Sequence, residues 1–125
     1  MKTRLFSGAR PLFAVVSLLF LALPAFAQNA EIAGVVRDTS GAVLPGVTVE
    51  ASSPALIEKS RVVYTDGQGA YRVIALVPGT YRVTYTLPGF GTVVREGIVL
   101  TAAFTASVDV SMAVGAVAET VTVSG

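Results

Sequence analysis

Apolar and polar residues alternate one for one along several stretches of this 125-residue chain. In the clearest stretch, Tyr81, Val83 and Tyr85 alternate with Arg82 and Thr84. Alternation with a period of two residues places one set of side chains on a core and the other set in water. Valine, threonine and tyrosine, which dominate these stretches, also suit the pleated surface of a sheet. The pattern therefore predicts an all-β fold.

Turn signals separate the alternating stretches. Pro-Gly pairs at residues 45–46, 78–79 and 88–89 favour type II turns, and residues 66–69 are typical of a hairpin loop. The turns recur roughly every 8–12 residues, as they do in a sandwich or barrel. The expected strands are 31–38, 46–52, 61–66, 70–76, 80–87, 91–99 and 103–113. Because no long helical segment lies between them, we expect about seven antiparallel strands in two packed sheets.

Residues 1–27 have the pattern of a secretory signal peptide. Basic residues precede an apolar run at 12–23, and an Ala-Phe-Ala triplet ends at Ala27. A spanning helix needs roughly 20 apolar residues, so the run is short for a permanent anchor, which is the alternative interpretation. No cysteine follows to carry a lipid. We expect cleavage between Ala27 and Gln28.

Charge and composition exclude several classes of function. The signal-peptide region holds three of the nine basic residues and none of the acidic ones, so six basic and eight acidic residues follow it, for a net charge of −2. No basic patch could neutralise a nucleic-acid backbone. The chain has no histidine and no cysteine, which excludes imidazole bases, thiol nucleophiles and a zinc peptidase site. A glycosidase pair of carboxylates stays open by spacing, although nothing groups the acids. We expect no enzyme, no cofactor and no metal.

A series of short motifs resembles one known family. In chain order, the motif residues are Ile32, Gly34, Val36, Asp38, Gly41, Leu44, Pro45, Gly46, Val47, Val49, Thr65, Asp66, Gly69, Tyr71, Val77, Pro78, Gly79, Tyr81, Val83, Pro88, Gly89 and Phe90. In this order they resemble the carboxypeptidase regulatory-like domain over about residues 30–113. The resemblance implies a transthyretin-like (prealbumin-like) β-sandwich, classed with carbohydrate-binding-like folds. The peptidase of the family name is a neighbouring domain in other proteins.

The segment after the expected sandwich, residues 114–125, contains the strand-like run AETVTVSG. The order of the parts resembles the N-terminus of Oar-like TonB-dependent outer-membrane receptors. These parts are a signal peptide, a regulatory-like domain at residues 28–113 and such a segment. In those receptors a plug and a barrel follow. The sequence ends at Gly125 without either. We interpret it as a receptor fragment or as a free-standing relative, and the segment as an added edge strand or the start of a linker.

Several residues carry both a structural and a functional interpretation. Asp38 and Asp66 stand at strand ends, where aspartate bonds nearby backbone N–H groups. Calcium binding is the functional alternative for Asp66, but calcium needs six or more oxygens. Gly34 inside a strand indicates close packing or a bulge, and the alternative is a ligand against its backbone.

The aromatic residues also carry two interpretations. Tyr64, Tyr71, Tyr81 and Tyr85 fall on alternating apolar positions, which favours a core over a sugar-stacking platform. Phe90 follows a Pro-Gly turn, where it either folds back or stands exposed. Phe90 and Tyr85 are the candidate contacts for a ligand or partner.

These features favour a non-catalytic structural or interaction module of the cell envelope. Its expected partner is an envelope protein or the remainder of an outer-membrane receptor, and its expected location is the periplasm, with outer-membrane association as a further step. A free-standing carbohydrate-binding module is a second hypothesis, which rests on fold analogy. The third is β-strand addition, in which residues 118–124 pair with a partner's sheet edge.

Overall fold

A computed structural model describes residues 28–115 and 119–123 of the chain. Every regular element in these residues is a β-strand, which confirms the predicted all-β fold. Within the same residues there is no helix with the length and apolarity of a membrane span. The predicted signal peptide, including Ala27, lies outside the described part, whereas Gln28 is exposed at its start.

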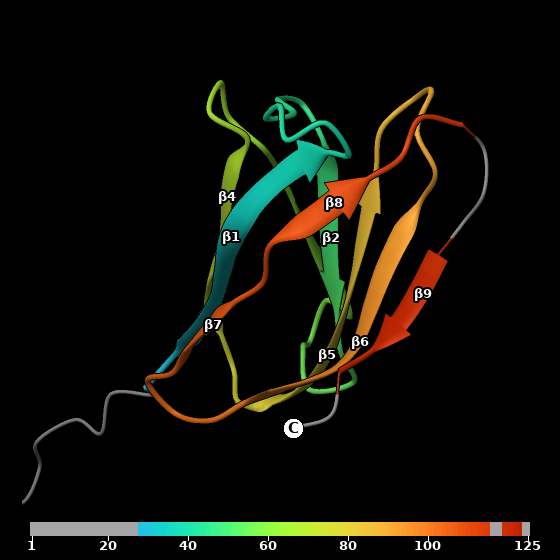
Figure 1. Cartoon of the computed structure of the whole chain (residues 1–125). Helices are drawn as coiled ribbons and strands as arrows, with labels where there is room; N and C mark the ends of the chain where they lie inside the picture. Colours follow the sequence, from blue (N-terminus) through green and yellow to red (C-terminus); the bar gives the residue numbers. More distant parts are fainter. Residues whose placement is uncertain (1–27, 116–118, 124–125) are drawn as a thin grey trace, which may run out of the picture.

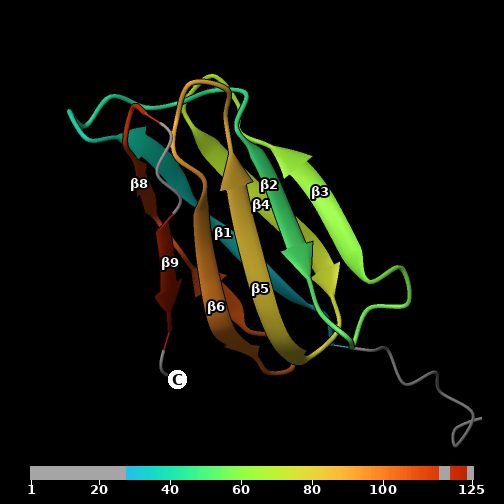
Figure 2. The same ribbon diagram turned by 90° about the vertical axis from the view of Figure 1, so that its right-hand side faces the viewer.

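The described residues contain two facing sheets (Figures 1 and 2). The strands are β1 (Ala30–Asp38), β2 (Thr48–Ser52), β3 (Ser60–Tyr64), β4 (Ala70–Leu76), β5 (Gly79–Thr86), β6 (Val93–Leu100), β7 (Thr105–Ser107), β8 (Val110–Met112) and β9 (Glu119–Thr122). One sheet has the order β4–β1–β7, with β8 also paired to β1, and the other has the order β3–β2–β5–β6–β9. The first six predicted strands correspond to β1 through β6, and the predicted sandwich is confirmed.

The seventh predicted strand, residues 103–113, is interrupted in the structure. β7 and β8 occupy its two halves, and Val108 and Asp109 lie between them. Val108 still donates its backbone N–H to the Ala33 carbonyl at 2.8 Å. A Cβ on Gly34 would lie only 1.9 Å from the Val108 carbonyl oxygen. Gly34 therefore permits a close approach of two backbones, as its position inside a strand predicted.

Antiparallel pairs form the centre of both sheets, whereas the strands added last are parallel. β7 and β8 run parallel to β1, and β9 runs parallel to β6. Parallel neighbours need a crossover connection. The chain provides two, because it passes between the sheets from β6 to β7 and again from β8 to β9 (Figure 1). This corrects the expectation of purely antiparallel sheets, which assumed that a crossover would contain a helix.

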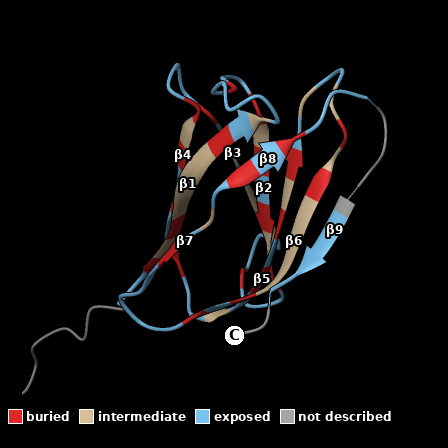
Figure 3. Ribbon diagram, in the orientation of Figure 1, coloured by how far each residue is buried: buried red, intermediate tan, exposed pale blue. Residues whose placement is uncertain are grey.

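Buried residues of both sheets form an apolar core, and Figure 3 marks the buried positions on the ribbon in red. Its largest fully buried members are Tyr81, Tyr85, Ile32, Leu76, Leu100 and Met112. Tyr71 is buried as well, so three of the four tyrosines lie where the alternation predicted. The prediction was wrong for Tyr64, which is 64% exposed on β3. Val62, Val63 and Tyr64 are all apolar, so the sequence did not indicate which face of β3 is inward.

Candidate interaction site at the open side of the sandwich

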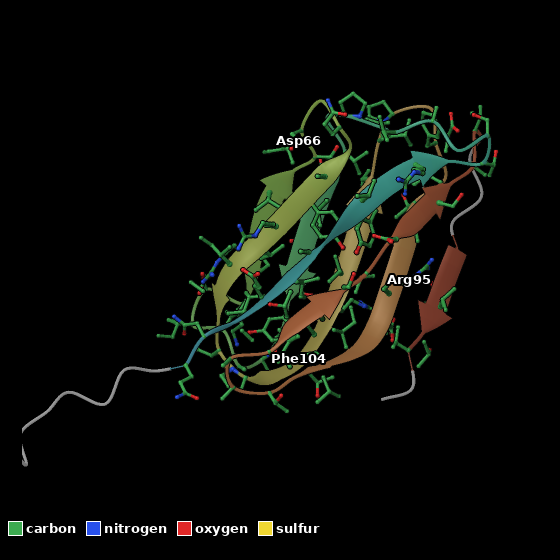
Figure 4. All side chains as sticks on the ribbon, turned by 60° about the vertical axis from the view of Figure 1, so that its left-hand side comes forward. Asp66, Arg95 and Phe104 are labelled. Carbon is green, nitrogen blue, oxygen red and sulfur yellow. The ribbon has the colours of Figure 1, made fainter. Side chains whose placement is uncertain are left out.

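An apolar hollow opens where β6 and the end of β9 face β7. We call it the edge slot; its volume is about 270 Å³. Its lining residues are Gly97, Ile98, Val99, Phe104, Ala106, Ser107, Val108 and Val123. Phe104 lies beside β7 and is 47% exposed, although its side chain is large and apolar (Figure 4). Val99 and Val123 at the same hollow are exposed as well, and a contiguous apolar patch of this kind is typical of a surface that contacts a partner.

Arg95 lies on β6 near this open side (Figure 4). It stands two residues after the buried Val93, so its side chain belongs to the inner face of the strand. Its Nη1 nitrogen is buried and has no hydrogen-bond partner among the described residues. A buried donor without an acceptor costs about 1–3 kcal/mol. Within the described residues this nitrogen is therefore an unsatisfied polar atom beside the core.

Two tyrosine hydroxyls form a hydrogen-bonded chain between the sheets. The Tyr71 hydroxyl lies 2.6 Å from the Val108 carbonyl oxygen and 2.7 Å from the Tyr85 hydroxyl. Because a carbonyl only accepts, Tyr71 donates to Val108, and Tyr85 donates to Tyr71. The two rings meet edge to face, with centroids 5.6 Å apart.

Burial controls how these hydroxyls ionise. It raises the pKa of Tyr85 to about 12, against the opposing effects of the hydrogen bond with Tyr71 and of the positive charge of Arg95. It also raises the pKa of Tyr71 well above its ordinary value, and the neighbouring Tyr85 adds to this shift. Both groups are therefore protonated near neutral pH, where they act as structural links between β4 and β5.

The structure places Tyr85 and Phe90, the two candidate contacts for a ligand or partner, in different surroundings. Tyr85 is 0% exposed, so in this fold its ring offers no surface to a ligand, which corrects that expectation. Phe90 is half-buried, packs against the core and forms an isolated bridge with Val114. Of the two arrangements considered for Phe90, the structure shows the one that folds back. Neither residue lines the edge slot.

Asp38 and Asp66 have the turn roles that the sequence predicted. An Oδ1 oxygen of Asp38 accepts from the backbone N–H of Ser40 at 2.8 Å, and that of Asp66 accepts from Gln68 at 2.8 Å. Asp66 lies in the loop between β3 and β4 (Figure 4). Within the described residues, no three acidic, histidine or cysteine side chains gather in a way that could hold a metal ion.

Two of the further surface hollows lie over other parts of the sandwich. One of about 270 Å³ is lined by Tyr64, Asp66, Ala70, Tyr71 and Arg72, and it places the exposed Tyr64 ring beside charged groups. The other, about 440 Å³, is an open hollow beside β5 and β6 that contains the Arg82–Glu96 ion pair.

Sequence reasoning missed Arg95 and Phe104, the two unusual residues at this side of the sandwich. Arg95 was not singled out, although a charged residue two positions after an apolar one was a usable signal. Phe104 falls inside the predicted strand 103–113, but in the structure it precedes β7 and is exposed. The alternation continued through Phe104 and gave no sign that the strand begins later.

The family model of the carboxypeptidase regulatory-like domain matches residues 31–113. The chain belongs to this family. It is also similar to the TonB-dependent transporter Oar of Myxococcus xanthus, with 36% identity over 102 residues that make up 81% of this chain. The matched region is 10% of the length of that transporter, so this chain corresponds to a small part of it. Both resemblances that the sequence motifs suggested are confirmed.

Solved structures with the same architecture have diverse activities. Hydroxyquinol 1,2-dioxygenase from Pseudomonas putida DLL-E4 superposes with a TM-score of 0.57 at 10% identity, covering 73% of this chain and 58% of the enzyme. A streptococcal ancillary pilin gives 0.53 at 19% identity, covering 71% and 33%. A carbohydrate-binding candidate from Bacteroides uniformis ATCC 8492 gives 0.53 at 18% identity, covering 66% and 40%. At these identities the likeness shows the fold alone.

Proposed function

We propose that this domain is a non-catalytic interaction module of the bacterial cell envelope and that it belongs to a TonB-dependent transporter polypeptide. The observation that carries the proposal is the 36% identity with the transporter Oar across 81% of the chain. Because the match spans only 10% of that transporter, the proposed role is that of an accessory module. Transport itself would require the remainder of such a protein.

The chemistry of the described residues supports a role in contact rather than catalysis. The chain contains no histidine and no cysteine. The tyrosine hydroxyls inside the sandwich are hydrogen-bonded to each other and to Val108. The edge slot, with its half-exposed Phe104, is instead an apolar surface suited to a protein partner.

The reading frame beyond codon 125 tests the transporter assignment directly. Sequencing this DNA should reveal a frame, intact or shifted, that encodes the plug and barrel of a transporter. An unrelated downstream sequence would count heavily against the proposal. It would favour a free-standing relative in the envelope.

Export is a separate part of the proposal and has its own test. The full chain, expressed in a Gram-negative host, should reach the periplasm with Gln28 as its first residue, as measured by intact mass. Replacing Ala27 with Leu should block processing, because the cleavage site needs small residues. A matched Ala30→Leu variant lies beyond the site and should be processed normally. A chain that keeps residues 1–27 in the wild type contradicts the assignment.

Tyr64 supports a second candidate function, carbohydrate binding. Its ring is 64% exposed and lines a hollow with Asp66 and Arg72, so one sugar face could stack on it. A glycan array with the purified protein tests this function, with Tyr64→Ala as the site variant and Val62→Ala on the same strand as the control. An absence of binding at millimolar sugar dismisses it.

A further inference from the structure

β9 is the strand whose described side chains are all exposed. It pairs with β6 through four register pairs, from Val93 opposite Glu119 to Glu96 opposite Thr122. Val121 is 39% exposed, and the threonines on either side of it are exposed as well. Backbone hydrogen bonds of a short parallel ladder therefore provide most of the attachment, with little apolar burial. Such a strand belongs to the part of a fold that opens at the lowest cost.

The edge of β6 is nevertheless shaped to receive this strand. Val123 donates its backbone N–H to the Glu96 carbonyl at 2.7 Å. The next residue, Gly97, has a φ of 75°, and a Cβ on it would lie 2.5 Å from the Val123 carbonyl oxygen. The approach of the strand thus depends on the missing side chain at Gly97. The Val123 side chain then contributes to the edge slot.

Departure of β9 would leave β6 as an unpaired edge. The backbone groups of residues 93–96 that pair with β9 would lose their partners. The edge slot would open wider beside Ile98 and Phe104. An unpaired strand edge is a template for another extended segment. β6 would thus offer three features to an incoming strand: unpaired backbone groups, the close approach that Gly97 permits, which we call the glycine notch, and the apolar edge slot. We call this combination the acceptor site.

We propose that this acceptor site binds the β9 segment of a second copy of the chain, so that two copies exchange this strand. The incoming segment has the same sequence, so it makes the same contacts that β9 makes within one copy. These are the four register pairs, the bond from Val123 to Glu96 and the close approach to Gly97. Exchange of an identical element needs no new interface, which makes it a low-cost route to a dimer.

Engineered cysteines can detect the exchange because the chain has none of its own. Val94 and Thr120 are register partners on β6 and β9. Full-length chains carrying Val94→Cys or Thr120→Cys, with different tags, are unfolded, mixed, refolded and oxidised. In an exchanged dimer the two backbones lie about 5 Å apart, within reach of a disulfide. We expect the covalent heterodimer to exceed random pairing about fivefold, since only this combination aligns the sulfurs.

Matched variants separate exchange from chance collision. Val94→Cys mixed with Thr39→Cys, an exposed turn position, should give only random pairing. Glu96→Cys with Thr122→Cys supplies an independent register pair if the first pair refolds poorly.

Two glycine variants then test the notch. Gly97→Ala, added to the cysteine chains, should abolish the excess of heterodimer. Gly46→Ala should retain it, because Gly46 has a similar φ of 78° with nothing within 4 Å of a Cβ. Random pairing at both register pairs, or an excess that survives Gly97→Ala, overturns the proposal. Neither result affects the assignment to a transporter polypeptide, on which the exchange does not rest.

Discussion

The Oδ1 oxygen of Asp109 accepts a hydrogen bond from the backbone N–H of Val35 at 2.9 Å. At this point β1 passes from its pairing with β7 to its pairing with β8. A side-chain carboxylate thus supplies the acceptor that a continuous neighbouring strand would supply from its backbone. The contact explains how β1 keeps its hydrogen bonding beside an interrupted strand.

Removal of this acceptor should be measurable. Asp109→Ala leaves the Val35 N–H without its partner, so the free energy of unfolding should fall by about 1 kcal/mol. Asp109→Asn keeps a side-chain oxygen in place and should lose less than half as much. Urea unfolding of the three proteins provides the comparison. Equal losses in the two variants would show that the hydrogen bond is not the cause.

Gly34 should tolerate substitution much less well than Asp109. A Cβ at this position would lie 1.9 Å from the Val108 carbonyl oxygen, which is backbone and cannot rotate away. Gly34→Ala should therefore lower the free energy of unfolding by about 3 kcal/mol or more. Gly67→Ala is the control, because nothing lies within 4 Å of its Cβ position. Thermal or urea unfolding should give Gly67→Ala a change within about 0.5 kcal/mol of zero. Similar stabilities for the two variants would contradict the close approach.

The sequence predicted most of the sandwich because local patterns determine most of it. Where polar and apolar residues alternate, as around Tyr81, Val83 and Tyr85, burial selects one face and hence the register. The same logic failed at Tyr64, because its polar neighbour Thr65 is the buried residue, with its hydroxyl donating to the Leu44 carbonyl, while Tyr64 faces outward. It also failed at the break near Asp109, where the pattern continues although the ladder does not.

The candidate site was harder to predict because it depends on crossovers between the sheets. The position of Phe104 beside the end of β9 follows from two connections between the sheets that carry no periodic signal in the sequence. Tyr85 lies on the alternating apolar face, and the structure shows it as a phenol buried with its own hydrogen-bond partner, which needs no ligand. Arg95 had a sequence signal in its position two residues after an apolar one, but the lack of a hydrogen-bond partner for its Nη1 among the described residues is seen only in the structure.

Replacement of Arg95 should stabilise the fold. Arg95→Met keeps a long side chain of similar volume and removes the buried Nη1 donor that lacks a partner among the described residues. The free energy of unfolding should rise by about 1 kcal/mol. Arg72→Met is the control: Arg72 is exposed and pairs with Glu31 at 2.7 Å, so its loss should lower stability by less than about 1 kcal/mol. A marked loss of stability in Arg95→Met would instead indicate that the guanidinium has a partner in solution.

Alkaline pH should weaken the fold through the buried tyrosines. Burial raises the pKa of Tyr85 to about 12 in the folded chain, whereas an unfolded tyrosine titrates near about 10. The folded state therefore holds the proton more tightly than the unfolded state does. This contribution to stability is complete below pH ~10 and is lost as the pH rises from there through about 12. Tyr71 acts in the same direction, because burial raises its pKa as well.

Tyr85→Phe isolates the effect, because it removes the titrating hydroxyl and keeps the ring. At neutral pH the variant should be less stable by about 1 kcal/mol, since Tyr71 loses the hydrogen bond that Tyr85 donates. Between pH ~10 and ~12, however, its free energy of unfolding should fall by about 2 kcal/mol less than that of the wild type. Urea titrations at several alkaline pH values measure both slopes. Parallel slopes would mean that Tyr85 ionises equally in the folded and unfolded chains, which is incompatible with its complete burial between the sheets.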